Sequence, residues 1–347
     1  MSEASYESVI SEINSFLSSM GAVERVKMIE ELKKILQKEL IMTHADVPEM
    51  VCPRCGSTES IRYGKTRVGT QRWQCKECGA VRCHKPTGGI LANTKLDISV
   101  WMDYVECFVD RLTCDEVADR LGVCHKTAWF MRLRTLQAIF INIPSFQVKS
   151  NSGAQFDEIF FRESFKGTRF DRMSFIPREA RKNNVSSKRG ISDEQICVIT
   201  GFNDSNDFFF DVCCRGPLTK EIAISSLKGH LCSGAIINTD ENRSYPYVMK
   251  ELAVATHIST NSKDHTVLKR INNIHGDIRK FFNRFNGVST RWLHLYLGWY
   301  KWRRCFHSAP KEVAAKQIVR GNYQNTWASI KGLLSPFRDA LMKPLKC

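Results

Sequence analysis

The 347-residue sequence contains no apolar run that approaches the roughly 18 residues needed to cross a bilayer. Its first residues, MSEASYESVI, lack the basic start and apolar stretch of a secretory signal peptide. No basic amphipathic helix stands out, which disfavours an anionic membrane surface as the partner. These absences predict a protein of the reducing cytoplasm with no membrane partner.

Acidic residues are also few relative to basic ones. Lys and Arg together number 51 and Asp and Glu number 36, which gives a formal net charge of +15. Such an excess favours polyanionic partners, and nucleic acid is the commonest of these. The charge therefore indicates a protein that binds nucleic acid.

Fourteen cysteines are present, but without a signal peptide we do not expect disulfides. Four of them form two C-x-x-C turns separated by 19 residues: Cys52, Cys55, Cys75 and Cys78. Four thiolates suit tetrahedral Zn²⁺, so this spacing predicts a zinc ribbon with a structural ion and no open ligand position. Residues 60–75 alternate as a β-hairpin does. Cys83 and His84 follow as alternative ligands, although we expect neither to bind the ion.

Residues 96–141 have the pattern of helices. In the segment LTCDEVADRLGVCHKTAWFMRLRTLQAI, one helix begins at a Thr113 cap, a turn follows at Gly122, and a second helix continues from there. This layout is that of a helix-turn-helix, whose second helix enters the major groove of DNA. His125, Lys126 and Arg132 would then face DNA. An ordinary helical hairpin is the alternative interpretation.

From residue 153 onward the pattern changes to three strands, and then helix and strand alternate. The strands are expected at 153–164, 194–204, 207–214, 234–240 and 255–260, and the helices at 219–231, 245–253 and about 265–285. Three antiparallel strands followed by alternating helix and strand is the order of a ribonuclease-H-like domain. It implies a mixed sheet with helices on both faces.

Asp157 stands in an apolar strand, AQFDEIFF, where an isolated charge is costly unless a cation meets it. In the expected fold this strand lies beside the strand that ends at Asp240. Two carboxylates that approach each other repel, and a shared divalent cation is the favourable solution. Oxygen ligands select Mg²⁺ or Mn²⁺, and two such ions suit phosphodiester chemistry. The alternative is a pair of structural aspartates, each paired with an arginine.

A third member of this site is expected from the helix LKRINNIHGDIRKFFNRF. Asn272, His275 and Arg279 share one face of it. Asn272 can offer a neutral carbonyl oxygen to a metal, and Arg279 or Lys280 can hold a phosphate. The alternative interpretation is a polar helix surface.

From residue 52 to about residue 304 the chain resembles the bacterial insertion-sequence transposases of the zinc-ribbon type, which have a DDE-like catalytic domain. The resemblance rests on the ribbon and on the blocks DEIFFRESFKG, SKRGISDEQICVI, NTDENRSY and NNIHGDIRKFFNRFNGVSTRWLHLYLGWY. It implies metal-dependent cleavage at the ends of a transposon and joining of the freed 3′-hydroxyl to target DNA. The ribbon and the helix-turn-helix would recognise terminal inverted repeats, within a homodimer or larger assembly at the nucleoid.

The resemblance also implies roles for individual residues. In this group the third acidic position is often an asparagine, followed by a lysine. Carried over, the site consists of Asp157, Asp240 and Asn272, and the lysine position falls on Arg279, beside Lys280. Three further placements stay open. Asn273 pairs with Lys280 in one, His275 takes the acidic position in another, and Glu163 is a supporting carboxylate in the third.

A basic insertion follows the first strand of this domain. Between residues 162 and 189 there are nine Lys or Arg against three acids. We expect a mobile loop that folds on DNA, with these contacts: Arg181, Lys182, Lys188 and Arg189.

The sequence thus predicts an α+β multidomain protein. Its regions are 1–46, helical; 47–90, the zinc ribbon; 91–150, helix-turn-helix-like; 151–310, the ribonuclease-H-like catalytic domain with basic loop 162–190; and 311–347, a tail. Two other functions remain open. One is a zinc-ribbon and helix-turn-helix regulator that binds DNA without cutting it, and the other is a ribonuclease-H-type nuclease that cuts but does not join.

Overall fold

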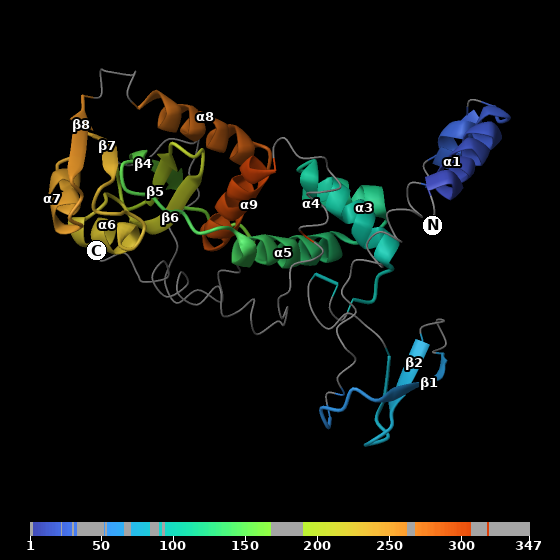
Figure 1. The fold of residues 1–347 in the computed structure, drawn as a ribbon. Coiled ribbons are helices and arrows are strands. Elements are labelled where there is room, and N and C mark those ends of the chain that lie inside the picture. The colour runs from blue at the N-terminus through green and yellow to red at the C-terminus, as the bar shows by residue number, and fades with distance from the viewer. Residues whose placement is uncertain are drawn as a thin grey trace. The chain divides into compact units, whose positions relative to one another are not determined.

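The structure is a computed structural model, and it describes residues 3–21, 23–29, 31–32, 52, 54–65, 71–83, 90–91, 94–167, 190–261, 268–306 and 318. The chain divides into two compact units, drawn together in Figure 1. One comprises Met1–Asp110 with Ala315–Asn322, and the other comprises Arg111–Ala314 with Tyr323–Cys347. The division falls inside the predicted region 91–150, so the first helix of that region belongs to a different unit from the later two.

In its described part, the first unit holds the helices α1 (Glu3–Ser18) and α3 (Ile98–Val109), further helical residues at 23–29 and 31–32, and a three-stranded sheet. Its strands are β1 (Ser60–Lys65), β2 (Gln71–Cys75) and β3 (Val81–Cys83), in the order β1-β2-β3. The predicted hairpin is confirmed, because β1 and β2 pair antiparallel. The third strand was not predicted. Most of β1 is exposed, so this sheet buries little apolar surface of its own.

The second unit begins with α4 (Cys114–Leu121) and α5 (His125–Asn142). The predicted cap is confirmed: the Thr113 hydroxyl accepts from the Glu116 amide, and the Glu116 carboxylate accepts from the Thr113 amide. Gly122 closes α4 at φ 64°, a left-handed conformation that favours glycine. The two helices pack against each other and α5 also packs along α9 (Leu293–Cys305), so the pair is part of this unit's core.

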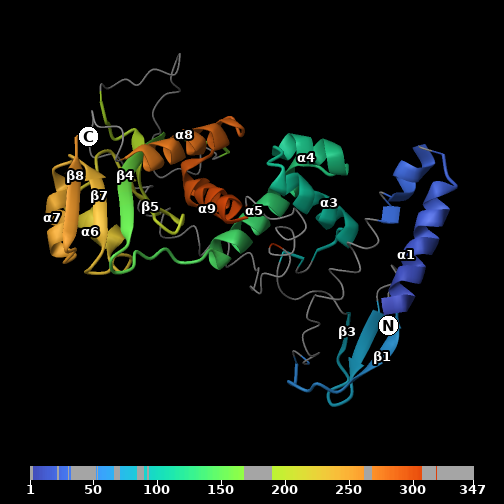
Figure 2. The ribbon, with the colours of Figure 1, turned by 45° about the horizontal axis from the view of Figure 1, so that its top comes forward.

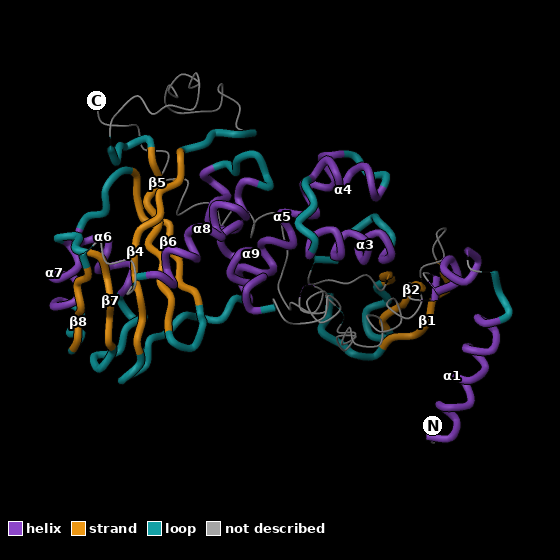
Figure 3. Tube along the Cα trace, turned by 90° about the horizontal axis from the view of Figure 1, so that it is seen from above, coloured by secondary structure: helices purple, strands orange, loops and turns teal. Residues whose placement is uncertain are grey.

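A five-stranded mixed sheet forms the centre of the second unit, in the order β6-β5-β4-β7-β8 (Figure 3). Its strands are β4 (Gly153–Arg162), β5 (Gln195–Asn203), β6 (Phe208–Arg215), β7 (Ile236–Asp240) and β8 (Thr256–Thr260). The first three strands pair antiparallel, and β4, β7 and β8 pair parallel. The expected mixed sheet is confirmed, as is the expected position of the first strand beside the strand that ends at Asp240.

Helices cover both faces of this sheet. Helices α6 (Lys220–Leu227) and α7 (Ser244–Glu251) lie on one side, and α8 (Lys269–Asn283) and α9 lie on the other (Figure 2). The short helix η3 (Thr290–Trp292) leads into α9. Alternate residues of β4 serve the two faces. Phe156 packs toward α6 and α7, and Phe161 contacts Phe282 of α8 with ring centroids 4.9 Å apart. Opposite Phe156 stands Gly201, where any side chain would collide with that ring.

None of the helices in the described ranges is long and apolar enough to span a bilayer.

Candidate functional site

The four ribbon cysteines come together in the first unit. One sulfur atom from each lies within 4.8 Å of the others, and two of the sulfur pairs, Cys52 with Cys78 and Cys55 with Cys75, are 3.5 and 3.6 Å apart. A tetrahedral zinc with Zn–S bonds of about 2.3 Å separates its sulfurs by about 3.8 Å. The cysteines therefore fit a structural zinc ion.

Two tight turns hold these thiols. The amide of Gly56 donates to the Cys52 carbonyl and the amide of Gly79 donates to the Cys75 carbonyl, each glycine with a positive φ. Backbone N–H groups of the same turns point at the sulfurs. They lower the pKa of Cys52 to about 6 and also lower the pKa of Cys75. The backbone N–H groups thus favour thiolates at Cys52 and Cys75. At Cys55 the backbone of Ser57 also lowers the pKa, but hydrogen bonds with the neighbouring thiols and burial outweigh it and raise this pKa to about 12. A shared zinc ion would stabilise all four thiolates together.

A second cluster of metal-binding side chains lies in the second unit, where β4 and β7 end their pairing. The ladder joins Gly153–Gln155 to Ile236–Asn238 and stops two residues before Asp157 and Asp240. Beyond it, carboxylate oxygens of Asp157, Glu158 and Asp240 all lie within 4.8 Å of one another. The predicted proximity of Asp157 and Asp240 is observed, and their role as metal ligands stays a prediction.

The carboxylates of this cluster are costly to ionise together. Burial, and then the charge of Asp240, raise the pKa of Asp157 to about 6, against the lowering effects of the Glu158 amide and Arg279. Burial, followed by the charges of Asp240 and Asp157, raises the pKa of Glu158 to about 7. A divalent cation would relieve this repulsion, and three carboxylates are the oxygen donors that Mg²⁺ and Mn²⁺ accept. The residues therefore fit such an ion.

Helix α8 places His275 against this cluster. The Thr200 hydroxyl donates to the Asp157 carbonyl at 2.9 Å, so its oxygen accepts from His275 Nε2–H at 2.6 Å. This leaves Nδ1 without a proton, 3.6 Å from an Asp157 carboxylate oxygen. Burial, and then the charge of Arg279, lower the pKa of His275 to about 4, so the ring is neutral. Two acceptors that face each other favour a cation between or beside them.

The other predicted members of the site all lie on α8, but they point to different sides of this helix. Asn272 and Asn273 are both exposed on α8, three and two residues before His275. Arg279 acts electrostatically on Asp157 and His275, so it belongs to the carboxylate side of the helix. Lys280 instead lines a separate basic pocket. The structure therefore separates the two basic residues that the sequence left as alternatives.

Glu158 is the residue that the sequence interpretation did not assign to the site. Its backbone amide donates to the Asp157 carboxylate at 2.8 Å, and its own carboxylate accepts from the Asn242 side-chain amide at 3.3 Å. The only sequence signal was that it adjoins Asp157 within an apolar strand. Glu163, weighed as a supporting carboxylate, is wrong for that role because it is buried and forms an ion pair with Arg215.

The predicted DNA-facing residues of α5 also separate. His125 and Lys126 are exposed in its first turn. Arg132 is only 2% exposed, and its guanidinium donates to the Leu112 carbonyl and lies over the rings of Phe285 and Trp299, 5.6 and 5.5 Å from their centroids. The prediction that Arg132 faces DNA is therefore wrong. The four predicted contacts of the basic loop, Arg181, Lys182, Lys188 and Arg189, lie outside the described residues.

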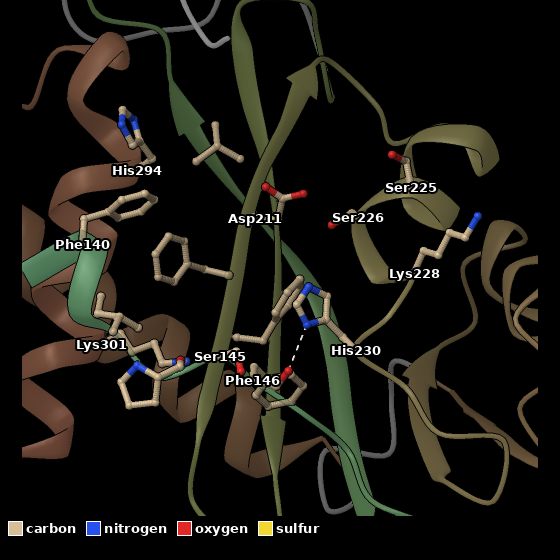
Figure 4. Close-up of a pocket in the computed structure, with 15 residues that line it drawn as sticks. Phe140, Ser145, Phe146, Asp211, Ser225, Ser226, Lys228, His230, His294 and Lys301 are labelled. Atoms are coloured by element: carbon tan, nitrogen blue, oxygen red, sulfur yellow. Dashed lines mark hydrogen bonds between the residues drawn. The ribbon is translucent and has the colours of Figure 1, made fainter. Parts of the chain in front are cut away.

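A cavity of about 420 Å³ lies in the same unit, away from the carboxylates (Figure 4). Phenylalanines form much of its wall, and Asp211 of β6 and Ser226 of α6 contribute polar atoms. His230 donates through Nδ1 to the Phe146 carbonyl at 2.9 Å, and burial lowers the pKa of His294 to about 4. No member of the carboxylate cluster lines this cavity, so it is not part of the candidate active site.

Comparison with known proteins adds a family match for the ribbon. Residues 47–79, which include all four cysteines, match a zinc-ribbon family described as the InsA N-terminal domain. The match covers a small part of the chain and concerns the ribbon. No curated protein matches the sequence.

Similar solved structures are distant. The simian T-cell lymphotropic virus intasome in complex with PP2A regulatory subunit B56 gamma contains a chain with 14% identity and a TM-score of 0.25. The alignment covers 52% of this chain and 58% of that one. A chain of a pre-cleavage Mos1 transpososome has 10% identity and a TM-score of 0.20, and the alignment covers 65% of this chain and 80% of that one. A chain of the Mos1 strand transfer complex has 12% identity and a TM-score of 0.21, and the alignment covers 90% of this chain and 96% of that one. Scores this low do not establish a shared fold.

Proposed function

We propose that this chain is a DNA transposase of the insertion-sequence type. It would cut DNA at the ends of a mobile element with metal ions held at Asp157, Glu158 and Asp240, and join the freed ends to target DNA. The observation that carries this proposal is the convergence of these three carboxylates where β4 and β7 stop pairing. Carboxylates that meet inside a basic protein suit metal-dependent phosphodiester chemistry.

The arrangement of the second unit supports a ribonuclease-H-like catalytic domain. Three antiparallel strands lead into two parallel strands, the first strand is central, and helices cover both faces. This is the order of elements that the sequence predicts for that fold. It brings the end of β7 beside the middle of β4, which is where the carboxylates meet.

Each residue of the site would have a distinct role. Asp157, Glu158 and Asp240 would hold Mg²⁺ or Mn²⁺, which when bound lower the pKa of a water and stabilise the leaving oxygen. Thr200 and His275 would position Asp157 from the α8 side. Arg279 would offer positive charge to a DNA phosphate, and Asn272 would complete the site from α8.

The remaining features fit a DNA-binding assembly. The InsA-type ribbon would hold zinc and, with the exposed first turn of α5, recognise the terminal inverted repeats. Both ends of an element must be cut together, so we expect a homodimer or larger assembly, acting at the nucleoid of the cytoplasm.

The proposal is tested with purified protein, Mg²⁺, a target plasmid and linear DNA that carries the sequences flanking this gene. We expect cleavage followed by joining to the plasmid. Asp157→Asn and Asp240→Asn should each reduce cleavage by at least about 1000-fold, because each removes a charged ligand. Asp211→Asn, on β6 and outside the cluster, is the matched control and should retain activity.

The other outcomes each contradict the proposal in a different way. DNA binding without any cleavage would identify a regulator. Cleavage without joining would identify a nuclease. Full activity of Asp157→Asn would remove the carboxylate cluster from the mechanism.

A further inference from the structure

A basic pocket of about 270 Å³ is lined by residues of α8 and α9 and by Arg111, which lies between α3 and α4. Its polar lining residues are Arg111, Asp277, Lys280, Tyr300, Arg303 and Arg304. Asp277 and Lys280 come from α8, and Tyr300, Arg303 and Arg304 come from α9. All of them belong to the second unit, and none belongs to the carboxylate cluster.

The pocket concentrates positive charge. Four cationic side chains share it with a single carboxylate, Asp277, which leaves three positive charges in excess. Burial, and then the charge of Arg111, lower the pKa of Arg303, so two of these cations already disfavour each other. Like charges gathered in a partly buried pocket are stabilised when an anion binds between them.

Its floor also presents hydrogen-bond donors. Tyr300 is 4% exposed, and burial raises the pKa of its hydroxyl against the charge of Arg304 and a hydrogen bond with the Arg304 side chain, so these two groups face each other in the pocket. The Nε atom of Arg304 is buried without a hydrogen-bond partner among the residues that the structure describes. The Arg304 guanidinium lies over the rings of Phe202 and Tyr300, 5.4 and 6.0 Å from their centroids. Aromatic rings fix the plane of a guanidinium and leave its N–H groups available for a phosphate.

Arg111 enters this pocket from a strained backbone. Its φ is 60°, in the left-handed region that non-glycine residues rarely adopt. Such a conformation is disfavoured for a residue with a side chain and persists where the surroundings require it. It gives the pocket a cation from outside the two helices.

We propose that this pocket binds a backbone phosphate of DNA at a point separate from the phosphate that is cut. Lys280 follows His275 by five residues, which places it about 140° farther around α8. One helix would therefore direct His275 and Arg279 toward the carboxylate cluster and Lys280 toward a second phosphate. The inference rests on the proposed function for the identity of the ligand as DNA.

Binding of a labelled DNA duplex to the full-length protein, measured by fluorescence anisotropy without added Mg²⁺, tests this inference. Lys280→Gln and Arg303→Gln should each weaken binding roughly threefold to tenfold and reduce the slope of log affinity against log salt by about 1. Lys280→Arg should restore both. Lys250→Gln, an exposed lysine in the last turn of α7, is the matched control and should change neither. Thermal unfolding of each variant confirms that the protein is folded.

Three results would overturn the inference. One is a DNA affinity that Lys280→Gln and Lys250→Gln weaken equally. A DNA affinity that neither variant changes would overturn it as well. The third concerns inorganic phosphate. If millimolar phosphate protects Arg303 from an arginine-modifying reagent but leaves the DNA affinity unchanged, the pocket binds a small anion and not DNA. Because the assay needs no cleavage, loss of DNA binding in Lys280→Gln would support the pocket even if the protein proved to be a regulator.

Discussion

The two candidate metal centres of this protein are built in opposite ways. The cysteines lie on two short turns close together in the sequence, and each turn is closed by hydrogen bonds from its own glycine. The carboxylates lie on two strands far apart in the sequence, and only the pairing of β4 with β7 brings them together. One centre is local, and the other depends on the whole sheet.

The difference has consequences for stability. The ribbon sheet has three short strands, and Ile61, Tyr63 and Val81 are each about half exposed, at 45–46%. A module that buries so little apolar surface needs its ion to fold. The carboxylates instead lie in a sheet with an extensive apolar core, where burial and the charge of Asp240 raise the pKa values of Asp157 and Glu158. There the fold exists first, and the charges cost energy until a metal binds.

Removal of zinc should give the largest effect. Cys75→Ser, or treatment with a zinc chelator, should unfold the ribbon, because metal binding contributes on the order of 10 kcal/mol to such domains. Hydrogen exchange should then be fast over residues 54–65 and 71–83 and unchanged over β5 and β6. Cys107→Ser, at a buried cysteine of α3, is the control. If the ribbon stays protected from hydrogen exchange without zinc, its folding does not depend on the ion, and the proposed difference between the two centres is wrong.

The carboxylate cluster should respond in the opposite direction. In Mg²⁺-free buffer at pH 8, Asp157→Asn should raise the free energy of unfolding by about 3 kcal/mol, because the pKa of Asp157 rises from 3.8 in the unfolded chain to about 6 in the folded protein. Asparagine keeps an oxygen that can accept from the Glu158 amide. Urea unfolding followed by tryptophan fluorescence measures the difference.

The raised pKa of Asp157 also determines how the free energy of unfolding changes with pH. The folded protein holds a proton on Asp157 that the unfolded chain has lost between about pH 4 and pH 6, so this group's contribution to stability is present below pH 4 and is lost as the pH rises through 6. The variant and the unmodified protein should therefore be equally stable near pH 4 and differ fully by pH 8. Mg²⁺ should close the gap at pH 8. A gap that grows at low pH would contradict this account.

The same distinction explains what the sequence could reveal. Thr113, Gly122 and the two C-x-x-C turns act on neighbours, and each was predictable with its role. The adjacency of Asp157 and Asp240 followed from the order of elements. Glu158 could not be assigned, because alternate residues of β4 point to opposite faces, and only the end of the β4–β7 ladder lets both side chains reach Asp240. Arg132 was predicted to face DNA because its contacts, the rings of Phe285 and Trp299, lie far away in the sequence and no local pattern indicates them.

Arg132 provides a smaller test of the same point. Arg132→Met should lower the free energy of unfolding by about 2 kcal/mol, because it removes a hydrogen bond from a charged donor and two cation–π contacts. The DNA affinity of the folded variant should be unchanged. Thermal unfolding and anisotropy on the same sample check both statements. Weakened DNA binding with unchanged stability would restore the original prediction for this residue.

Lys126, six residues earlier on the same helix, should show the reverse behaviour with the smallest effect. It is exposed in the first turn of α5, so Lys126→Gln should leave stability unchanged and weaken DNA binding by about threefold, with a lower salt slope. Lys126→Arg keeps the charge and is the control. If Lys126→Gln binds DNA as tightly as the unmodified protein, α4 and α5 are a helical hairpin that packs on α9, and recognition of DNA must come from elsewhere in the chain.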